Sequence, residues 1–123
     1  MSDIFEITKQ FTFEAAHYFP NMPEGHIYKK IHGHSFVAEV TFYGKKNKDN
    51  QWVTDFDELS KSLKEIKKKL DHKCINDIIE IGLPTLENIS SWIGKQLKKK
   101  YSNVRSIKLS RPSCGESCVY NVS

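Results

Sequence analysis

Three histidines stand at spacings that could hold a metal ion: His17, His32 and His34. His32 and His34 flank Gly33, and residues two positions apart in a β-strand project from the same face. Gly33 would let the backbone bend close to whatever the two imidazoles bind. A neighbouring antiparallel strand ending at His17 would bring a third imidazole within about 5 Å. Three neutral nitrogen ligands suit Zn²⁺ and leave one position open for water or a substrate.

A second interpretation of these histidines stays open. A His-x-His pair also arises by chance on a solvated strand, and His17 could be a core residue with one satisfied hydrogen bond. The position of His17 at the end of the preceding predicted strand favours the metal. The zinc hypothesis therefore predicts bound metal that is lost in a His32→Ala variant.

The hydrophobic pattern indicates the strands that must carry the histidines. Apolar residues alternate from Ile4 to His17 and again from His32 to Tyr43. In both segments the histidines share the parity of the apolar positions, which predicts two strands with the imidazoles on one side. Pro20, Pro23 and Gly25 mark a loop between the strands.

Two amphipathic helices and two short strands are expected to follow. The first helix begins at Asp55 and keeps a helical apolar spacing to Leu70, and the second begins at Thr85. Strands are expected near residues 105–111 and 117–122. The order predicts an α+β domain of the form ββααββ, with a four-stranded antiparallel sheet and both helices on one face.

Length and composition limit the other possibilities. The 123 residues contain no repeat or flexible linker, so we expect one domain over residues 1–123. An apolar content of 38% makes the core thin, and free sheet edges would favour a homo-oligomer joined through strands. Three cysteines without a secretory signal predict reduced thiols. We expect a cytoplasmic protein with no membrane partner, since no apolar run is long enough to cross a bilayer.

The net charge of +4 comes mostly from lysines at 67–69 and 98–100, near the ends of the two predicted helices. Cations are favoured there by the helix dipole, so we interpret these runs as solvated helix ends. The basic excess could also attract an anionic substrate. No arginine-rich strip or set of stacking aromatics supports nucleic-acid binding, so the expected partner is a small molecule.

A series of short segments carries a further signal along nearly the whole chain. They are Phe11–His17 (FTFEAAH), Pro23–His26 (PEGH), His32–Phe36 (HGHSF), Leu70–His72 (LDH), Ile75–Asp77 (IND) and Pro84–Asn88 (PTLEN). Together they resemble the 6-pyruvoyl-tetrahydropterin synthase / 6-carboxytetrahydropterin synthase family. The resemblance implies the tunnelling fold, in which ββααββ subunits form trimers, commonly hexamers, with active sites between subunits.

In loop length and motifs the chain is most similar to bacterial 6-carboxytetrahydropterin synthases of the queuosine (7-deazaguanine) pathway. These lyases convert dihydroneopterin triphosphate and release acetaldehyde and triphosphate. The resemblance implies Zn²⁺ on the three histidines, where it would bind the substrate's side-chain oxygens and act as a Lewis acid. Asp71 and His72 match the family's proton-transfer pair, and Glu87 lies in a matching segment that implies substrate contact. Asp71 and His72 could equally cap the end of the first helix, which is compatible with catalysis.

Tyr28 departs from the family pattern. Family members carry a catalytic cysteine four residues before the first histidine of His-Gly-His, and Tyr28 stands there. A phenol is a poor general base near neutral pH, so Tyr28 does not simply inherit that role. Glu14 and Glu24 lie in segments shared with ordinary members and are interpreted as structural. Cys74 could approach the site, although a packing role is the plainer interpretation.

Arg111 stands where the family has a glutamate that binds the amino-pyrimidine edge of the pterin. Arginine offers only hydrogen-bond donors, whereas that edge requires an acceptor. Glu116, in a segment with a one-residue insertion, is the nearest substitute. Alternatively, Arg111 binds an anionic group of a different substrate. Cys114 and Cys118 resemble cysteines of the same family segment, but their spacing alone is weak evidence for a metal.

The leading hypothesis is therefore a zinc-dependent pterin-processing lyase nearest to 6-carboxytetrahydropterin synthase. One alternative is a paralogue that binds a pterin or related heterocycle without converting it. Another is an enzyme that cleaves or epimerises a dihydroneopterin-like side chain by retro-aldol chemistry, which requires zinc and a base but not the thiol. The reaction class is thus a carbon–oxygen or carbon–carbon lyase.

Overall fold

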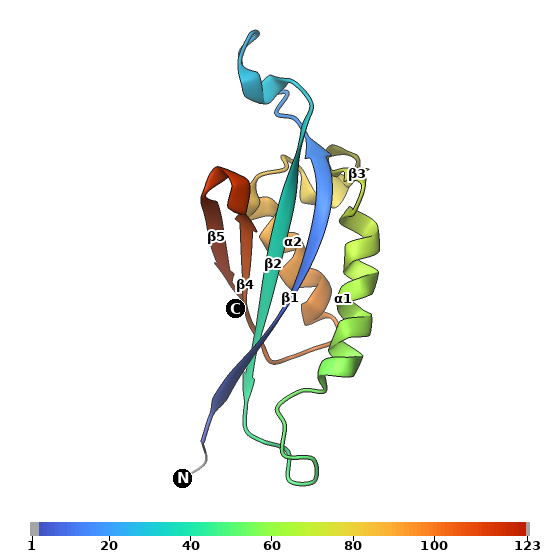
Figure 1. Cartoon of the computed structure of the whole chain (residues 1–123), viewed down its shortest axis with the longest axis vertical. Coiled ribbons are helices and arrows are strands. Elements are labelled where there is room, and N and C mark those ends of the chain that lie inside the picture. The colour runs from blue at the N-terminus through green and yellow to red at the C-terminus, as the bar shows by residue number, and fades with distance from the viewer. Residues whose placement is uncertain (1–2, 123) are drawn as a thin grey trace.

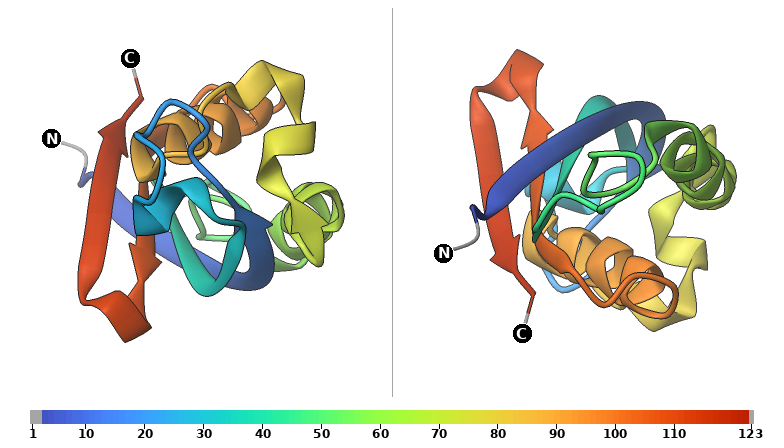
Figure 2. Two further views of the ribbon diagram at one scale, coloured as in Figure 1. Left: turned by 90° about the horizontal axis from the view of Figure 1, so that it is seen from above. Right: turned by 90° about the horizontal axis from the view of Figure 1, so that it is seen from below.

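The computed structural model describes residues 3–122, which form one sheet with two α-helices on one side of it (Figure 1, Figure 2). The strands are β1 (Phe5–His17), β2 (His32–Gly44), β3 (Lys73–Cys74), β4 (Val104–Arg111) and β5 (Glu116–Asn121), and the helices are α1 (Phe56–Leu70) and α2 (Leu86–Lys98). Across the sheet the order is β3-β1-β2-β4-β5. A short 3₁₀ turn, Pro112–Cys114, connects the last two strands.

Both helices begin where the capping residues predict. The Asp55 side chain accepts a hydrogen bond from the backbone N–H of Asp57 at 2.9 Å, ahead of α1. The Thr85 hydroxyl accepts one from the backbone N–H of Asn88 at 3.0 Å, ahead of α2. These side chains satisfy amide groups that have no partner in the first helical turn.

The expectation of a four-stranded antiparallel sheet is wrong, because a fifth strand makes the sheet mixed. β3 has two residues and runs parallel to β1, with Lys73 opposite Ala15 and Cys74 opposite Ala16. The other strand pairs are antiparallel. A two-residue strand is too short for an alternating pattern to be recognised in the sequence. The element order is therefore ββαβαββ.

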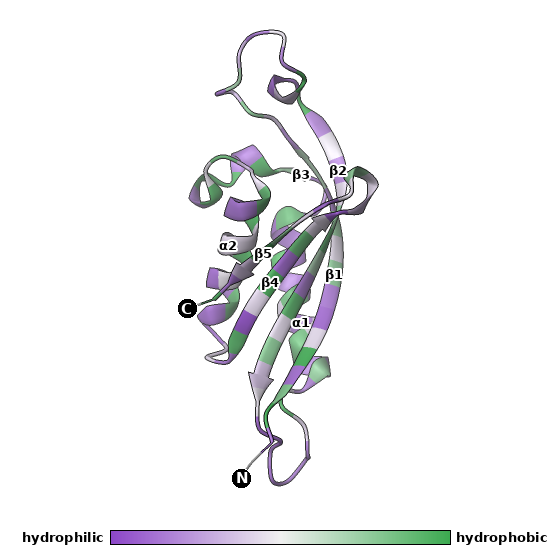
Figure 3. Cartoon of the chain, turned by 90° about the vertical axis from the view of Figure 1, so that its left-hand side faces the viewer, coloured by the Kyte–Doolittle hydropathy of each residue, from purple (hydrophilic) through white to green (hydrophobic). Residues whose placement is uncertain are grey.

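The core lies between the sheet and the two helices. Its strand residues include Phe13, Phe36 and Ile107, and its helix residues include Leu59 and Ile93, all essentially inaccessible to solvent. Figure 3 shows the underlying alternation as apolar and polar bands along the strands. Burial of one strand face against two amphipathic helices accounts for the two-layer architecture.

β1 and β2 form a long ribbon that carries the predicted metal ligands at one end. Their register pairs Phe5 with Gly44 at one end and His17 with His32 at the other. Segment 18–31 leaves the sheet at His17, projects beyond it and returns at His32 (Figure 1). In the described part of the chain, no helix combines the length and apolar content needed to span a bilayer.

Candidate metal centre and adjoining pocket

The three predicted ligand histidines converge at the end of the β1–β2 ribbon. The ring centroids of His17 and His32 are 4.5 Å apart, and His34 lies 5.0 Å from His17 and 4.9 Å from His32. One nitrogen from each ring lies within 4.8 Å of the others. The strand register brings His17 opposite His32, and the two-residue period of β2 brings His34 to the same side. The arrangement is suitable for one divalent ion.

Backbone hydrogen bonds determine which nitrogens of two of these rings face the centre. Nδ1 of His17 lies 3.0 Å from the carbonyl oxygen of Pro84, and Nδ1 of His32 lies 2.8 Å from that of Lys30. Carbonyl oxygens only accept, so each Nδ1 carries the hydrogen and each Nε2 keeps a lone pair. Nε2 of His17 is buried and has no hydrogen-bond partner among residues 3–122. Burying a polar atom without a partner is unfavourable, and a metal ion bound to this Nε2 would supply the missing partner.

Electrostatics favour neutral rings at this position. Burial lowers the pKa of His17 from 6.5 to about 4, and the nearby His32, His34 and Arg111 act in the same direction, whereas the hydrogen bond that His17 donates to the Pro84 carbonyl raises the pKa. Burial and the Arg111 guanidinium also lower the pKa of His34. Both shifts favour the neutral imidazole at pH 7, and the neutral ring is the form that coordinates a metal.

A pocket of about 610 Å³ opens beside the histidines and contains four of the other predicted site residues. These are Tyr28, Glu87, Arg111 and Glu116, which line it together with His32 and His34. Apolar side chains from segment 18–31 and from the start of α2 complete the wall, among them Phe19, Ile27 and Leu86. Apolar walls with a few converging polar groups are typical of a site for a small organic molecule.

Arg111 and Glu116 form an ion pair in the wall of this pocket. An Nη of Arg111 lies 2.9 Å from a carboxylate oxygen of Glu116, and the two residues are cross-strand partners at the ends of β4 and β5. The Arg111 side chain is 17% exposed and that of Glu116 is 48% exposed. The guanidinium thus holds the carboxylate at the pocket edge, where it can accept hydrogen bonds from a ligand.

Tyr28 contributes an aromatic wall near His32. Its ring centroid lies 6.5 Å from that of His32 and 6.0 Å from that of Phe19. The backbone N–H of Tyr28 donates to Nδ1 of His26 at 3.1 Å, and its carbonyl accepts from the Phe19 N–H at 2.7 Å. These bonds hold the tyrosine on the pocket side of segment 18–31.

Asp71 and His72 lie apart from this pocket. His72 Nδ1 contacts Asp71 at 2.8 Å, and the other Asp71 oxygen accepts from the Glu14 N–H at 2.8 Å. The His72 N–H in turn donates to the Glu14 carbonyl at 2.6 Å. The hydrogen bond from Glu14, followed by that from His72, lowers the pKa of Asp71. The carboxylate therefore stays charged and holds the imidazole in one orientation.

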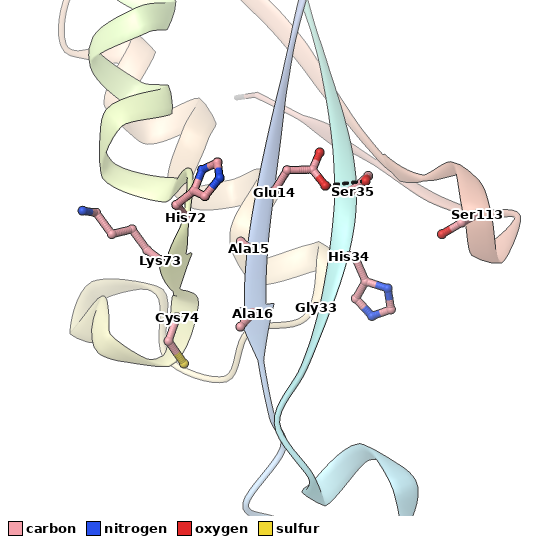
Figure 4. A pocket seen from close by; sticks show the side chains of 10 residues that line it. All are labelled: Glu14, Ala15, Ala16, Gly33, His34, Ser35, His72, Lys73, Cys74 and Ser113. Atoms are coloured by element: carbon pink, nitrogen blue, oxygen red, sulfur yellow. Dashed lines mark hydrogen bonds between the residues drawn. The ribbon is translucent and has the colours of Figure 1, made fainter.

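The backbone of His72 is in the left-handed region, with φ of 59°. This conformation is costly for a residue with a side chain and recurs at functional sites. The ring is largely exposed. It borders a shallow depression that Glu14, Cys74 and His34 also line, and Figure 4 shows the His72 ring beside β1 and the His34 ring beside β2.

Two residues contribute more to these sites than their sequence context indicates. Glu14 contributes its backbone to the hydrogen bonds that hold Asp71 and His72. Cys114 lies with its sulfur 3.7 Å from Nδ1 of His34, although the sequence offers only a C-x₃-C spacing as a signal. By contrast, Cys74 sits on β3 beside Asn76, and all three cysteines of the described chain are free.

Comparisons with known proteins give a consistent result. The sequence model of the family described as 6-pyruvoyl tetrahydropterin synthase matches residues 6–122. The chain is 41% identical over 98 residues to a putative 6-carboxy-5,6,7,8-tetrahydropterin synthase of Archaeoglobus fulgidus, covering 80% of each protein. It is 35% identical to a dihydroneopterin monophosphate aldolase of Pyrococcus furiosus, covering 77% of this chain and 78% of that protein.

A solved structure extends the likeness to the fold. The 6-pyruvoyl tetrahydropterin synthase of Caenorhabditis elegans superposes with a TM-score of 0.86, covering 99% of this chain and 98% of that one. At 20% identity this likeness shows the fold alone. The expected tunnelling-type fold is confirmed, with the fifth strand as the correction.

Proposed function

Because the chain belongs to the 6-pyruvoyl tetrahydropterin synthase family of pterin-processing lyases, we propose that it is a zinc-dependent lyase acting on the side chain of a dihydroneopterin phosphate. The first candidate is the 6-carboxytetrahydropterin synthase reaction on dihydroneopterin triphosphate. The observation that carries the proposal is the convergence of His17, His32 and His34 beside a pocket of suitable size and polarity.

The donor set suits zinc. His17 and His32 would bind through Nε2, because their Nδ1 atoms are engaged by backbone carbonyls. Three imidazoles leave a coordination position for the substrate's side-chain oxygens. When bound, zinc would supply Lewis-acid chemistry, acidifying those hydroxyls and polarising a developing carbonyl.

The pocket residues would hold the pterin ring. Glu116, positioned by Arg111, would accept hydrogen bonds from the amino-pyrimidine edge of the pterin. Glu87, in the first turn of α2, offers a second carboxylate in the same wall. Tyr28 would pack against the substrate near His32. These contacts would place the side chain of the substrate, rather than its ring, beside the three histidines.

His72 would act as the proton-transfer residue, with Asp71 as its partner. The His72 ring is exposed, Asp71 is partly buried, and neither lines the pocket of the same chain. We therefore propose that Asp71 and His72 of a neighbouring copy complete each site, as the family resemblance implies for a trimer or hexamer. The hydrogen bonds to Glu14 and the strained φ of His72 support a functional role for this pair.

Mixing two inactive variants tests the shared site. His32→Ala lacks a metal ligand and His72→Ala lacks the base, so each alone should be inactive. After dissociation and reassembly together, some sites would combine an intact metal centre with an intact His72, and activity should partly return. A mixture of His32→Ala and His34→Ala is the matched control and should stay inactive. Native mass spectrometry verifies that subunits have exchanged. If they have and activity still does not return, the proposal that His72 completes the site of a neighbouring copy is contradicted.

A second candidate function is retro-aldol cleavage of the same side chain. It is favoured by Tyr28 at the family's thiol position and by the 35% identity to the Pyrococcus furiosus aldolase. In this reaction a base removes the proton of the 2′-hydroxyl, and the bond between C1′ and C2′ breaks. C2′ becomes the aldehyde carbon, and C1′ receives a proton. A metal-activated hydroxyl and one base suffice, so a thiol is unnecessary.

One product assay separates the candidates. Zinc-loaded protein is incubated with dihydroneopterin triphosphate and, separately, with the monophosphate. Acetaldehyde with triphosphate supports the synthase, and glycolaldehyde or its phosphate ester supports the aldolase. Pterin binding without product supports a non-catalytic paralogue. If no pterin binds, the proposal fails and Arg111 would indicate a different, anionic substrate.

A further inference from the structure

We propose that Cys114 is an outer-sphere partner of the metal centre, whose sulfur accepts a hydrogen bond from Nδ1–H of His34 and keeps Nε2 of that ring directed at the metal. This inference rests on the proposed zinc site. It assigns a role to a cysteine that the proposed reaction does not otherwise use. Cys114 is thereby a positioning residue rather than a catalytic one.

The three histidines show a common pattern on their outer side. Nδ1 of His17 contacts a backbone carbonyl at 3.0 Å, Nδ1 of His32 contacts another at 2.8 Å, and Nδ1 of His34 contacts the Cys114 sulfur at 3.7 Å. Metal-binding histidines almost always donate their second N–H to an acceptor, which sets the tautomer and the ring orientation. Sulfur is a weak acceptor but fits this role. All three rings then present Nε2 to one point.

The position of Cys114 is set by a tight turn. The 3₁₀ turn Pro112–Cys114 ends at Gly115, which has a φ of 66°, and the Gly115 N–H donates to the Pro112 carbonyl at 3.1 Å. The Arg111–Glu116 ion pair closes the base of this turn at 2.9 Å. The turn therefore presents the sulfur to His34 from a constrained backbone.

Direct coordination of the same ion by Cys114 does not fit this geometry. The sulfur contacts Nδ1, whereas the proposed ligand atom of His34 is Nε2 on another edge of the ring. The Arg111 guanidinium is close enough to His34 to lower its pKa, but a guanidinium cannot accept a hydrogen bond. Glu116 is another nearby acceptor, but within residues 3–122 its carboxylate pairs with Arg111, and Nδ1 of His34 contacts the Cys114 sulfur instead. Cys114 is thus the group that can orient His34.

Zinc affinity, measured by competition with a chromogenic chelator, tests the assignment. Cys114→Ala should weaken zinc binding by about ten- to hundredfold, the usual effect of losing an outer-sphere partner. Cys114→Ser keeps an acceptor and should restore most of the affinity. Cys118→Ala is the matched control, because the Cys118 sulfur contacts Ser90 at 3.4 Å rather than His34. The zinc affinity of this variant should equal that of the unaltered chain.

Three results would contradict the proposal. Equal zinc affinity of Cys114→Ala and the unaltered chain would remove the role of Cys114 while leaving the proposed function intact. No zinc binding by the unaltered chain would mean that the proposed function itself fails. In cobalt-substituted protein, an intense near-ultraviolet thiolate band that disappears in Cys114→Ser would make Cys114 a direct ligand instead. The expected spectrum lacks that band.

Discussion

His17, the last residue of β1, lies directly opposite His32, the first residue of β2, with 4.5 Å between their ring centroids. The hydrogen-bond register of two strands therefore assembles the centre. A slip of one residue would move either side chain to the other face of the sheet. The long β1–β2 pairing, from Phe5 to His17, makes such a slip unfavourable.

Removing one of these ligands should abolish stoichiometric metal binding. His32→Ala leaves two imidazoles, and the purified variant should lose its zinc on dialysis, whereas the unaltered chain retains about one ion per chain. His26→Ala is the control, because its ring contacts the Tyr28 N–H in segment 18–31. Elemental analysis checks both variants. Zinc retained at full stoichiometry by His32→Ala would contradict the ligand assignment.

The metal-free protein should become less stable as the pH falls from about 6.5 to about 4. In the folded state burial holds the pKa of His17 near 4, so over this range the unfolded chain binds a proton that the folded chain does not. The loss should reach about 3 kcal/mol and stop below pH 4, where both states are protonated. The lowered pKa of His34 acts in the same direction.

Urea unfolding of zinc-free protein at a series of pH values measures this loss. His17→Asn is the control, since it removes this titrating ring and should reduce the pH dependence to the part that comes from His34. Parallel curves for the two proteins would show that His17 does not titrate as its burial implies.

Restoring the thiol tests how much of the synthase machinery remains. Tyr28→Cys should raise the release of acetaldehyde from dihydroneopterin triphosphate, because a thiol is a better base than a phenol near neutral pH. Tyr28→Ser is the control, because serine is similar in size to cysteine but lacks the thiol. This variant should show no gain in acetaldehyde release. If both variants release the same amount of acetaldehyde, the thiol is not what the site lacks.

Replacing His72 should separate stability from activity. Glycine adopts a φ of 59° without steric cost, so His72→Gly should raise the free energy of unfolding by about 1 kcal/mol while abolishing lyase activity. His72→Ala keeps the Cβ atom and should lose activity without that gain. Denaturant unfolding and the product assay provide the two readings. A destabilised His72→Gly would mean that the imidazole supports the fold.

Glu116 should govern pterin affinity. Glu116→Gln removes the charged acceptor and should weaken binding of a pterin by about tenfold or more, as expected for losing a hydrogen bond to a charged group. Glu24→Gln is the control, because Glu24 pairs with Lys29 and lies outside the pocket lining. The pterin affinities of both variants are measured by fluorescence titration. Unchanged affinity in Glu116→Gln would leave Glu87 as the candidate anchor.

The parts of this protein that the sequence predicted are those governed by short-range periodicity. Alternation along β1 and β2 placed His17, His32 and His34 on one side, and the capping residues Asp55 and Thr85 located both helices. These features depend on strand and helix periods that recur within a few residues.

Features that depend on distant contacts were not predictable in this way. β3 is defined by pairing with β1 and has no period of its own. The separation of His72 from the pocket follows from the path of the chain after α1. The contact of Cys114 with His34 spans 80 residues and depends on the turn between β4 and β5.

Segment 18–31 is bounded by two of the converging histidines, His17 and His32. An ion held by both would therefore cross-link the two ends of this projecting segment and, while bound, would limit the conformations that the segment can reach when it opens locally. Metal loading should thus protect the whole hairpin tip from proteolytic cleavage, even at peptide bonds far from the ion.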